Sequence, residues 1–467
     1  MKRFFPIGWL LVWSSMAMAQ INGFDLKQIA DDEIVGSSRY VGLCGAMAAV
    51  GGDMSAVKDN PAALGVFRYS ELSMTLSTDI AGTTNVSVSG VDILVSLNRG
   101  NLSGVVGHNL MFSYQRRKRF GGAYSLSAKG LKTSQTDLMA AMADGYTYDQ
   151  LANTDGIGFL AYAGFDGWLI DTISGGTGRQ WGSLEPGNVN AQLQIAESGS
   201  VDDYHFNWGM NISHRVYVGA GMHIRSLSYT KETTYSERFE SGNSYRLRSG
   251  MYVSGIGLGA SAGVIWRPLS MIRLGLSLQT PTLTAVNLQH TGDILADIEG
   301  ETYGNDNYRH PWQGTISMPW RAVAGAAWQI GTHGLLSAEY DFAYRHQTGM
   351  QAQHMMKVGA EWAITPSCFL DAGYAAQWYG GYVGNVSVNQ LAENAQRLDT
   401  DQQAFSPKHY AAAGFTYRNR WLTAGIAYQF SRRTNTIWAH QYQNEPMGIV
   451  NDKNHKVVIT LGFRLGI

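Results

Sequence analysis

The feature that most constrains this chain is a period-two alternation of apolar and polar residues that recurs from Tyr69 onward. Successive side chains of a β-strand face opposite sides, so such a segment has one apolar and one polar face. The last segment shows this most clearly, with Val457, Ile459, Leu461, Phe463, Leu465 and Ile467 on one face and Lys456, Thr460, Gly462, Arg464 and Gly466 on the other. The pattern is typical of a wall between lipid and a polar lumen.

The alternation predicts strands near 70–79, 106–116, 120–130, 203–214, 216–232, 247–267, 270–289, 313–330, 334–346, 353–364, 367–379, 408–417, 420–431 and 455–467. Short turns are expected at 116–119, 213–216, 267–271, 331–333, 365–367 and 418–420, and long connections elsewhere. An even strand number with alternating joints is the plan of outer-membrane barrels, and a soluble β-sandwich needs no such asymmetry. We therefore predict an all-β fold, a transmembrane antiparallel β-barrel of about 14 strands spanning residues 69–467.

Composition agrees with a membrane barrel and argues against other classes. Only 15% of the 467 residues are charged, whereas 55 are glycine and 11% are aromatic. After the first residues, no apolar run approaches the ~20 residues that a spanning helix needs. A formal net charge of −1 indicates no nucleic-acid partner. Cys44 and Cys368 give no disulfide framework, and no clustered metal ligands occur, so we expect no metal and no cofactor.

The N-terminus divides into two parts. Residues 1–19 have the basic start, apolar core and small-residue exit of a secretory signal peptide, with cleavage expected before Gln20. Export of a barrel predicts the outer membrane of a Gram-negative cell. Residues 20–68 follow, and within them 37–64 are rich in Gly and Ala without helical or strand periodicity. Because this stretch cannot form a core of its own, we interpret it as a hatch, or plug, inside the lumen.

Charged residues fall on the predicted lumen face of neighbouring strands: Arg321, Glu339, Asp341, Lys357, Glu361 and Asp371. They could line an ion path, or they could pair and hold the wall and the hatch together. Unpaired charges in a confined lumen are costly to desolvate, which favours the paired ladder. Pro281 and Pro319 fall at about the same height on adjacent strands, and neither can donate a hydrogen bond to the ladder. The two could create a bend of the strands or a notch in the wall, and we favour the bend.

The longest predicted loop, residues 131–202, has a helical pattern of its own. Thr133 or Ser134 can cap a helix, and apolar residues follow at helical spacing. Long loops with internal structure are commonly functional, so we expect a ligand-capture site made of Leu138, Met139, Met142, Tyr146, Tyr148 and Leu151. The alternative is a lid that only packs on the barrel rim.

The N-terminal stretch resembles the FadL/TodX family of outer-membrane transporters for long-chain fatty acids and other hydrophobic compounds. The matching hatch positions are Gly42, Gly45, Gly51, Gly52, Asp53, Asn60, Pro61 and Ala62, and residues 274–281, 318–330 and 335–344 resemble the family's strands. The resemblance implies a hatch inside the barrel and diffusion without ATP. It also implies sideways release at a kink in the third strand, where this sequence has Gly121 and Gly122. No residues match the family's head-group-binding motif.

The predicted function is passive transport of a hydrophobic small molecule, such as a fatty acid, a detergent or an aromatic compound. The alternative is a surface-assembly or secretion accessory that uses the plugged barrel as a docking platform. A hydrolase would need a nucleophile, a base and an orienting group in contact, whereas His205, His214 and His223 are explained as wall or loop residues. We therefore expect no enzyme and no catalytic residue. The expected surroundings are outer-membrane lipid and lipopolysaccharide, and the expected state is a monomer.

Overall fold

A computed structural model describes residues 23–80, 86–97, 104–153, 158–173, 180–185, 187–344, 352–379, 398, 400–440, 443 and 445–465. The predicted signal peptide, residues 1–19, lies outside this part of the chain.

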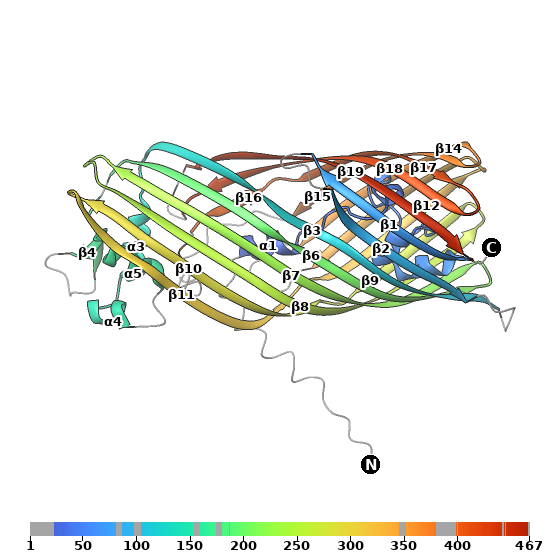
Figure 1. Cartoon of the computed structure of the whole chain (residues 1–467), viewed down its shortest axis with the longest axis horizontal. Coiled ribbons are helices and arrows are strands. Elements are labelled where there is room, and N and C mark those ends of the chain that lie inside the picture. Colours follow the sequence, from blue (N-terminus) through green and yellow to red (C-terminus); the bar gives the residue numbers. More distant parts are fainter. Residues whose placement is uncertain are drawn as a thin grey trace, which may run out of the picture.

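The described residues form a closed antiparallel β-barrel (Figure 1). The sheet has 17 strand segments that make 14 wall strands, because three wall strands consist of two segments each. In order, the wall strands are β1 (Ser70–Asp79), β2 (Val86–Leu97), β3 (Val105–Leu131), β6 (Val189–Ile212), β7 (Val216–Phe239), β8 (Ser244–Leu269), β9 (Ile272–Gln279) with β10 (Leu283–Ile298), β11 (Glu301–Ser317) with β12 (Trp320–Ile330), β13 (Gly334–Tyr344), β14 (Gln353–Thr365), β15 (Cys368–Tyr379), β16 (Gln402–Phe405) with β17 (Lys408–Arg418), β18 (Leu422–Trp438) and β19 (Gly448–Leu465). Pairing of β1 with β19 closes the barrel, so the predicted fold class is confirmed.

The two ends of the barrel differ, and the two faces of the wall differ. We call the end with the short connections, such as 213–215 and 331–333, the turn end, and the opposite end the loop end. Outward side chains such as Ile426 and Tyr428 are exposed, and inward ones such as Gln429 are buried. An apolar outer face and a polar inner face are what a barrel in lipid requires.

Two local predictions were wrong, and their errors cancel in the strand count. The segments near 106–116 and 120–130 are one continuous strand, β3, and the charged run 116–119 is not a turn. A register shift between Arg116 and Lys118 lets this run stay inside the wall, because it changes which side chains face the lumen. The missed strand is β2, whose inner face carries Leu94 between polar positions and so hides the alternation. The loop predicted over residues 131–202 is also shorter than expected, because β6 begins at Val189.

Pro281 and Pro319 interrupt two adjacent wall strands at one height. The flanking pairs, Leu283 with Ser317 and Gln279 with Arg321, have the same register, which places the two prolines opposite each other. Neither proline can donate to the ladder. Nearby, Met318 N–H donates to Thr282 O at 2.9 Å, so the break is bridged by a backbone hydrogen bond. This arrangement favours a bend.

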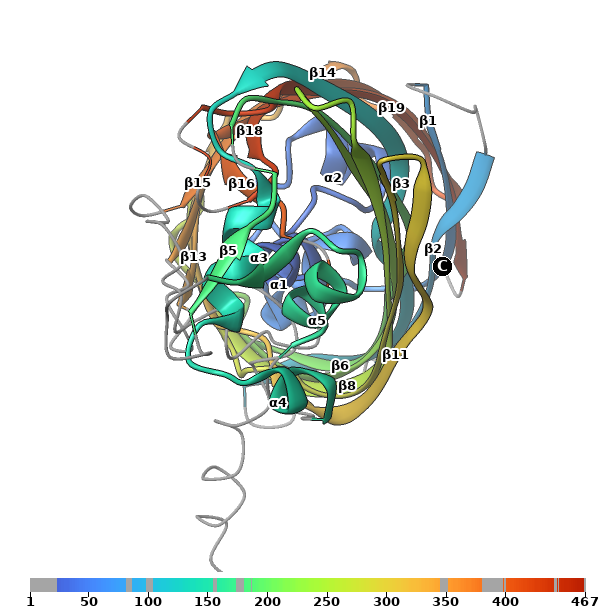
Figure 2. The same cartoon turned by 90° about the vertical axis from the view of Figure 1, so that its left-hand side faces the viewer.

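Helices lie inside the barrel and across its loop end. Inside are α1 (Gly23–Ala30), α2 (Ser38–Gly42) and the 3₁₀-helices η3 (Met54–Lys58) and η4 (Pro61–Val66). At the loop end are α3 (Gln135–Ala143), α4 (Tyr148–Asn153) and α5 (Phe159–Asp166), with the small sheet of β4 (Ile170–Thr172) and β5 (Trp181–Ser183) (Figure 2). Ser134, one of the two residues predicted as a cap, caps α3 and forms a capping box with Asp137. No helix in the described ranges combines the length and apolarity that crossing a bilayer demands.

Candidate functional site

Residues 23–68, which we call the N-terminal segment, occupy the lumen, and glycines of the wall make room for them. A Cβ on Gly373 would lie 2.5 Å from the carbonyl carbon of Leu43, and a Cβ on Gly209 would lie 2.7 Å from Leu64 Cβ. A Cβ would also come closer than 3.0 Å to the segment at four further wall glycines: Gly219 (to Pro61), Gly263 (to Asn60), Gly275 (to Ala48) and Gly359 (to Leu43). Only glycine allows two backbones to approach so closely. The segment and the wall are therefore complementary in shape at the turn end.

The residues of the predicted hatch motif form the turns of this segment. Gly45, Gly51 and Gly52 have φ values of +76°, +64° and +70°, a region that residues with a Cβ rarely adopt. Asp53 caps η3, and its carboxylate accepts from Ser55 N–H at 2.9 Å. Gly42 faces β15 across a space in which a Cβ would lie 2.8 Å from Asp371 Cβ. Glycine is thus required by both conformation and space.

Asn60 connects two parts of the segment to the wall. Its Oδ1 accepts from Ala62 N–H at 3.0 Å, and its Nδ2 donates to Ala48 O at 2.8 Å and to Val264 O of β8 at 3.2 Å. Pro61 follows at the first position of η4, where a missing N–H costs nothing. The Asn-Pro-Ala group therefore combines a cap, a bend and a wall contact.

Buried ion pairs hold the segment at the turn end. Arg39 of α2 forms a bidentate pair with Glu361 of β14, with Nη2 and Oε1 3.0 Å apart. Glu339 of β13 accepts from Met47 N–H and Ala48 N–H at 3.0 and 2.7 Å, and it pairs with Lys357 Nζ at 2.7 Å. Charges of the wall are thus neutralised by the segment and by neighbouring strands.

Within the described part of the chain, five of the six residues of the predicted charge ladder, all except Asp371, form ion pairs. Arg321 forms an ion pair with Asp341, and its Nη2 also lies 2.9 Å from Asp59 Oδ1 of the segment. Asp371 accepts from Thr416 Oγ1 at 3.1 Å. The prediction of a ladder that holds the wall and the segment together is confirmed. The contacts of these residues favour a paired network over an ion path.

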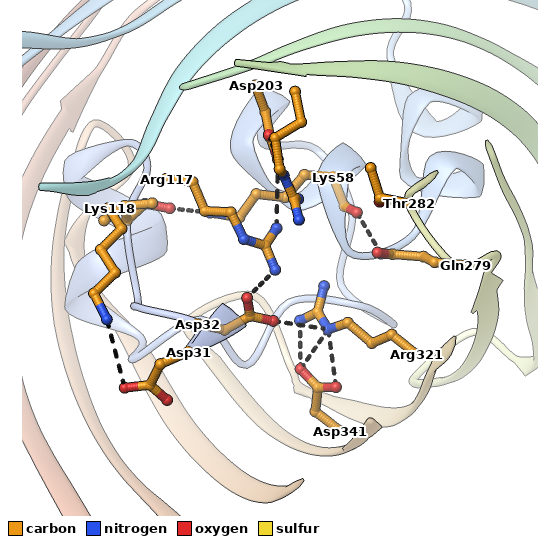
Figure 3. Close-up of polar contacts among 12 residues, drawn as sticks. Asp31, Asp32, Lys58, Arg117, Lys118, Asp203, Gln279, Thr282, Arg321 and Asp341 are labelled. Atoms are coloured by element: carbon orange, nitrogen blue, oxygen red, sulfur yellow. Dashed lines mark hydrogen bonds and ion pairs between the residues drawn. The ribbon is translucent and has the colours of Figure 1, made fainter. Parts of the chain in front are cut away.

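A second group of contacts surrounds an acidic stretch of the segment, Asp31, Asp32 and Glu33. Asp31 Oδ2 lies 2.9 Å from Arg433 Nη1, and Glu33 Oε2 lies 3.4 Å from Lys456 Nζ. Figure 3 shows Asp32 between Arg117 and Arg321. We call the surrounding cations of five wall strands the charged belt: Arg117, Lys118, Arg321, Lys408, Arg433 and Lys456. The belt encloses three consecutive acidic residues that sequence reasoning did not single out.

Burial and charge shift pKa values within the segment in a direction that favours these pairs. Burial alone would raise the pKa of Glu33, but Lys408 and Lys456 outweigh it and lower the pKa to about 2. Burial would likewise raise the pKa of Asp31, but Arg433 and other cations of the belt lower it well below its usual range. The belt therefore keeps Asp31 and Glu33 ionised across the physiological range of pH.

An apolar patch lies on the inner wall beside the charged belt. We call it the lumen patch, and it consists of Phe120, Val201, Leu227, Tyr229, Met251, Val253, Val286, Leu288, Ile316 and Met318, with Ile29 of α1 packed against it. On β3, Phe120 follows the belt residue Lys118 by two positions, so patch and belt adjoin. Apolar residues on a lumen face are unexpected for a water-filled channel.

The loop end is closed by a separate apolar cluster. Leu138, Met139 and Leu151 of the predicted capture site are buried in it, among side chains of α5 and of strands β6, β7, β8, β10 and β11. Met142 packs against its edge. Tyr146 and Tyr148 are exposed, at 36% and 54%. The structure therefore divides the predicted capture residues into a buried set and an exposed set.

Gly121 and Gly122 lie in β3, next to a seam in the wall. Their pairing with β6 is regular, Gly121 with Ser198 and Gly122 with Glu197, and the nearest register shift falls at Arg116. The ladder from β2 to β3 ends at Gln115, and the ladder from β1 to β19 ends at Lys456. Beyond those residues, no ladder joins β3 to β19 within the described ranges. The glycines thus face a seam created by the short β1–β2 hairpin.

Comparison with known proteins identifies the architecture. No family model and no curated protein matches the chain. The toluene transporter TodX of Pseudomonas putida is similar at a TM-score of 0.51 and 12% identity, over 93% of this chain and 99% of that chain. A FadL homologue of Pseudomonas aeruginosa is similar to the same degree, with a TM-score of 0.51 and 12% identity over 93% of this chain and 99% of that chain. The chain has the fold of the FadL/TodX outer-membrane transporters.

This FadL/TodX-type barrel has the outer face that its environment requires. Apart from the seam beside β3, its closed sheet pairs the neighbouring strands of the described wall, and exposed apolar side chains surround it. The chain is therefore a multi-pass protein of the Gram-negative outer membrane. In the described part of the chain, no group of three or more His, Cys, Asp or Glu has the geometry of a metal site.

Proposed function

We propose that this barrel passes hydrophobic compounds across the outer membrane by diffusion, with the N-terminal segment acting as a hatch. The observation that carries the proposal is the lumen patch, an apolar part of the inner wall that is buried with Ile29 of the N-terminal segment packed against it. When the segment shifts, these side chains would give a greasy molecule an apolar surface. The similar solved structures are a toluene transporter and a FadL homologue, which supports a hydrophobic ligand.

The charged belt beside the patch suggests a finer class of ligand, an amphiphile with an anionic head such as a long-chain fatty acid. Lys118 Nζ lies 2.6 Å from Gln28 O and 4.0 Å from Asp31 Oδ2, both of the N-terminal segment, and 5.0 Å from the centre of the Phe120 ring of the patch. A carboxylate arriving with its chain on Phe120 would compete for the same cation. Such competition would loosen the acidic stretch and allow the hatch to shift.

The remaining predicted residues have places in this route. We propose that the exposed set at the loop end, Tyr146 and Tyr148 with Met142, makes first contact with ligand. The hatch motif around Asn60 then governs passage along the lumen. Gly121 and Gly122 border the seam, where sideways release would require the fewest backbone hydrogen bonds to break.

The proposal is tested with purified protein in liposomes, by following entry of labelled palmitate, hexadecanol and toluene. Leu227→Asn removes apolar surface from the patch, and because burying a leucine is worth ~1.5–3 kcal/mol, we expect roughly tenfold slower entry. The control is Ser228→Asn, which puts the same side chain on the exposed outer face of the same strand. Equal entry with and without wild-type protein would contradict transport and favour the docking platform. Equal entry of palmitate and hexadecanol would contradict only the anionic head group.

A further inference from the structure

The outer face of the wall repeats one side-chain arrangement three times. A tyrosine hydroxyl meets a histidine Nδ1 on the neighbouring strand, in the pairs Tyr340 with His354 at 2.6 Å, Tyr374 with His409 at 2.8 Å and Tyr428 with His455 at 2.6 Å. Each tyrosine lies six residues after the first residue of its strand, β13, β15 or β18. The three pairs therefore lie at one height around this side of the barrel.

These pairs mark the edge of the apolar outer face that is nearer to the loop end. On β18 the outward residues run from Ile426 through Tyr428 and Phe430 to Arg432, where the first charge occurs. Arg432 follows Trp421, at the turn end, by 11 positions. At ~3.3 Å per residue and a tilt of roughly 40°, this corresponds to about 28 Å of height, close to the ~25 Å apolar band of such barrels. Arg432 therefore lies at the level of the lipid head groups on the loop-end side, which in outer-membrane barrels faces the outer leaflet because their longer loops are extracellular.

Directly at this level, basic side chains form a row across three strands. His409 of β17 is paired in register with Arg432 of β18, and Arg432 is paired with Lys453 of β19. The three side chains are exposed. Two like charges directly opposite each other on a sheet destabilise it. Among the described residues, no carboxylate forms an ion pair with Arg432 or Lys453.

We propose that this row binds the phosphate groups of lipopolysaccharide in the outer leaflet. A phosphate between Arg432 and Lys453 would remove their repulsion, and an arginine offers it a bidentate contact. With the Tyr374 hydroxyl donating to Nδ1, the His409 ring carries its hydrogen on Nε2 and can donate to the same head group. Phe430, whose ring lies 5.0 Å from that of His455, provides apolar surface below for an acyl chain. The site is on the outside of the wall and is independent of transport through the lumen.

The test measures lipid binding to the purified, detergent-solubilised full chain by native mass spectrometry. The lipids are diphosphorylated lipid A and the same lipid A after removal of both phosphates. We expect wild type to bind the phosphorylated form at least about tenfold more tightly, and Arg432→Gln with Lys453→Gln to lose this preference. The matched control is Arg215→Gln with Arg420→Gln, which removes two exposed cations at the turn end and should keep the preference.

Thermal unfolding in lipid-free detergent separates lost binding from a folding defect. Because the double variant relieves a like-charge contact, its unfolding temperature should equal or exceed that of wild type. Equal binding of both lipids by wild type, or an unchanged preference in Arg432→Gln with Lys453→Gln, would overturn the site. Inorganic phosphate that competes as strongly as lipid A at the same concentration would also overturn it, because the row would then bind any anion.

Discussion

The two ends of the lumen differ in buried charge. At the turn end, the N-terminal segment is held by buried ion pairs such as Arg39 with Glu361, by backbone contacts over wall glycines and by an apolar cluster that includes Leu43. At the loop end, α3 and α5 are held by an apolar cluster that includes Leu138 and Met139. A buried ion pair contributes little net stability, because desolvation offsets its attraction, but removal of one partner leaves a buried charge uncompensated. The difference suggests that the loss of a single charge can release the turn end, whereas the loop end depends on apolar packing.

The largest expected effect comes from breaking one ion pair at the turn end. Arg39→Met leaves Glu361 buried without its cation, which costs about 3–5 kcal/mol, and the segment should then leave its seat far more often. In planar bilayers we expect frequent channel openings where wild type is quiet. The double variant Arg39→Met with Glu361→Met removes both charges and should be much quieter than the single variant. A single variant as quiet as wild type would show that this pair does not hold the segment.

The complementary change at the loop end should leave conductance unaltered. Met139 is fully buried and packs against Gly164 of α5, where a Cβ would lie 2.8 Å from Met139 Sδ. Met139→Ala should cost roughly 2–5 kcal/mol of local packing and speed proteolysis of residues 135–166 from outside the cell. Met142→Ala, at the cluster edge, is the matched control and should have a smaller effect. If Met139→Ala instead opened the channel, the division of labour between the two ends would be wrong.

The contrast between the ends also explains which features were predictable from sequence. Period-two alternation shows which residues of a strand face lipid and which face the lumen. On β18 the outward residues from Ile426 to Phe430 are apolar and the inward ones are small or polar, and this pattern was enough to predict the barrel. It failed at β3, because the charged run 116–119 resembles a turn unless one knows that the segment supplies Asp32 as a partner for Arg117. The strand β2 was missed because Leu94 faces the segment rather than water.

Parts of the candidate site were visible in the sequence, and parts were not. The ladder around Arg321 and Asp341 could be predicted, since charges on neighbouring strands must pair in a confined space. The acidic stretch Asp31–Glu33 was not recognised, because its meaning depends on cations that lie up to 425 positions away, such as Lys456. Its three consecutive carboxylates were the available signal. One wall glycine had a signal too: Gly425 lies on the polar face of the alternation, and a Cβ there would lie 2.3 Å from Ser38 Oγ of the segment.

The smallest expected effect is a pH dependence that arises where the charged belt holds the N-terminal segment. Glu33 has a pKa of about 2 instead of its ordinary 4.5, because burial raises it but Lys408 and Lys456 lower it further, with Lys118 adding to them and Asp31 opposing. Since the pKa is depressed when the segment is seated, this carboxylate stabilises the seated state fully above 4.5, and the contribution is lost as the pH falls toward 2.

The contribution of Glu33 to leak conductance should therefore stay constant from pH 8 to about 4.5 and rise below that, and Glu33→Gln should abolish this rise. Replacing both cations, Lys408→Met with Lys456→Met, leaves burial as the dominant influence and raises the pKa of Glu33. The conductance rise should then begin at a higher pH than in wild type, while proteolysis at the loop end, which involves no belt residue, should be the same in both proteins. A rise that begins at the same pH in the lysine variant and in wild type would mean that the belt does not hold the segment through Glu33.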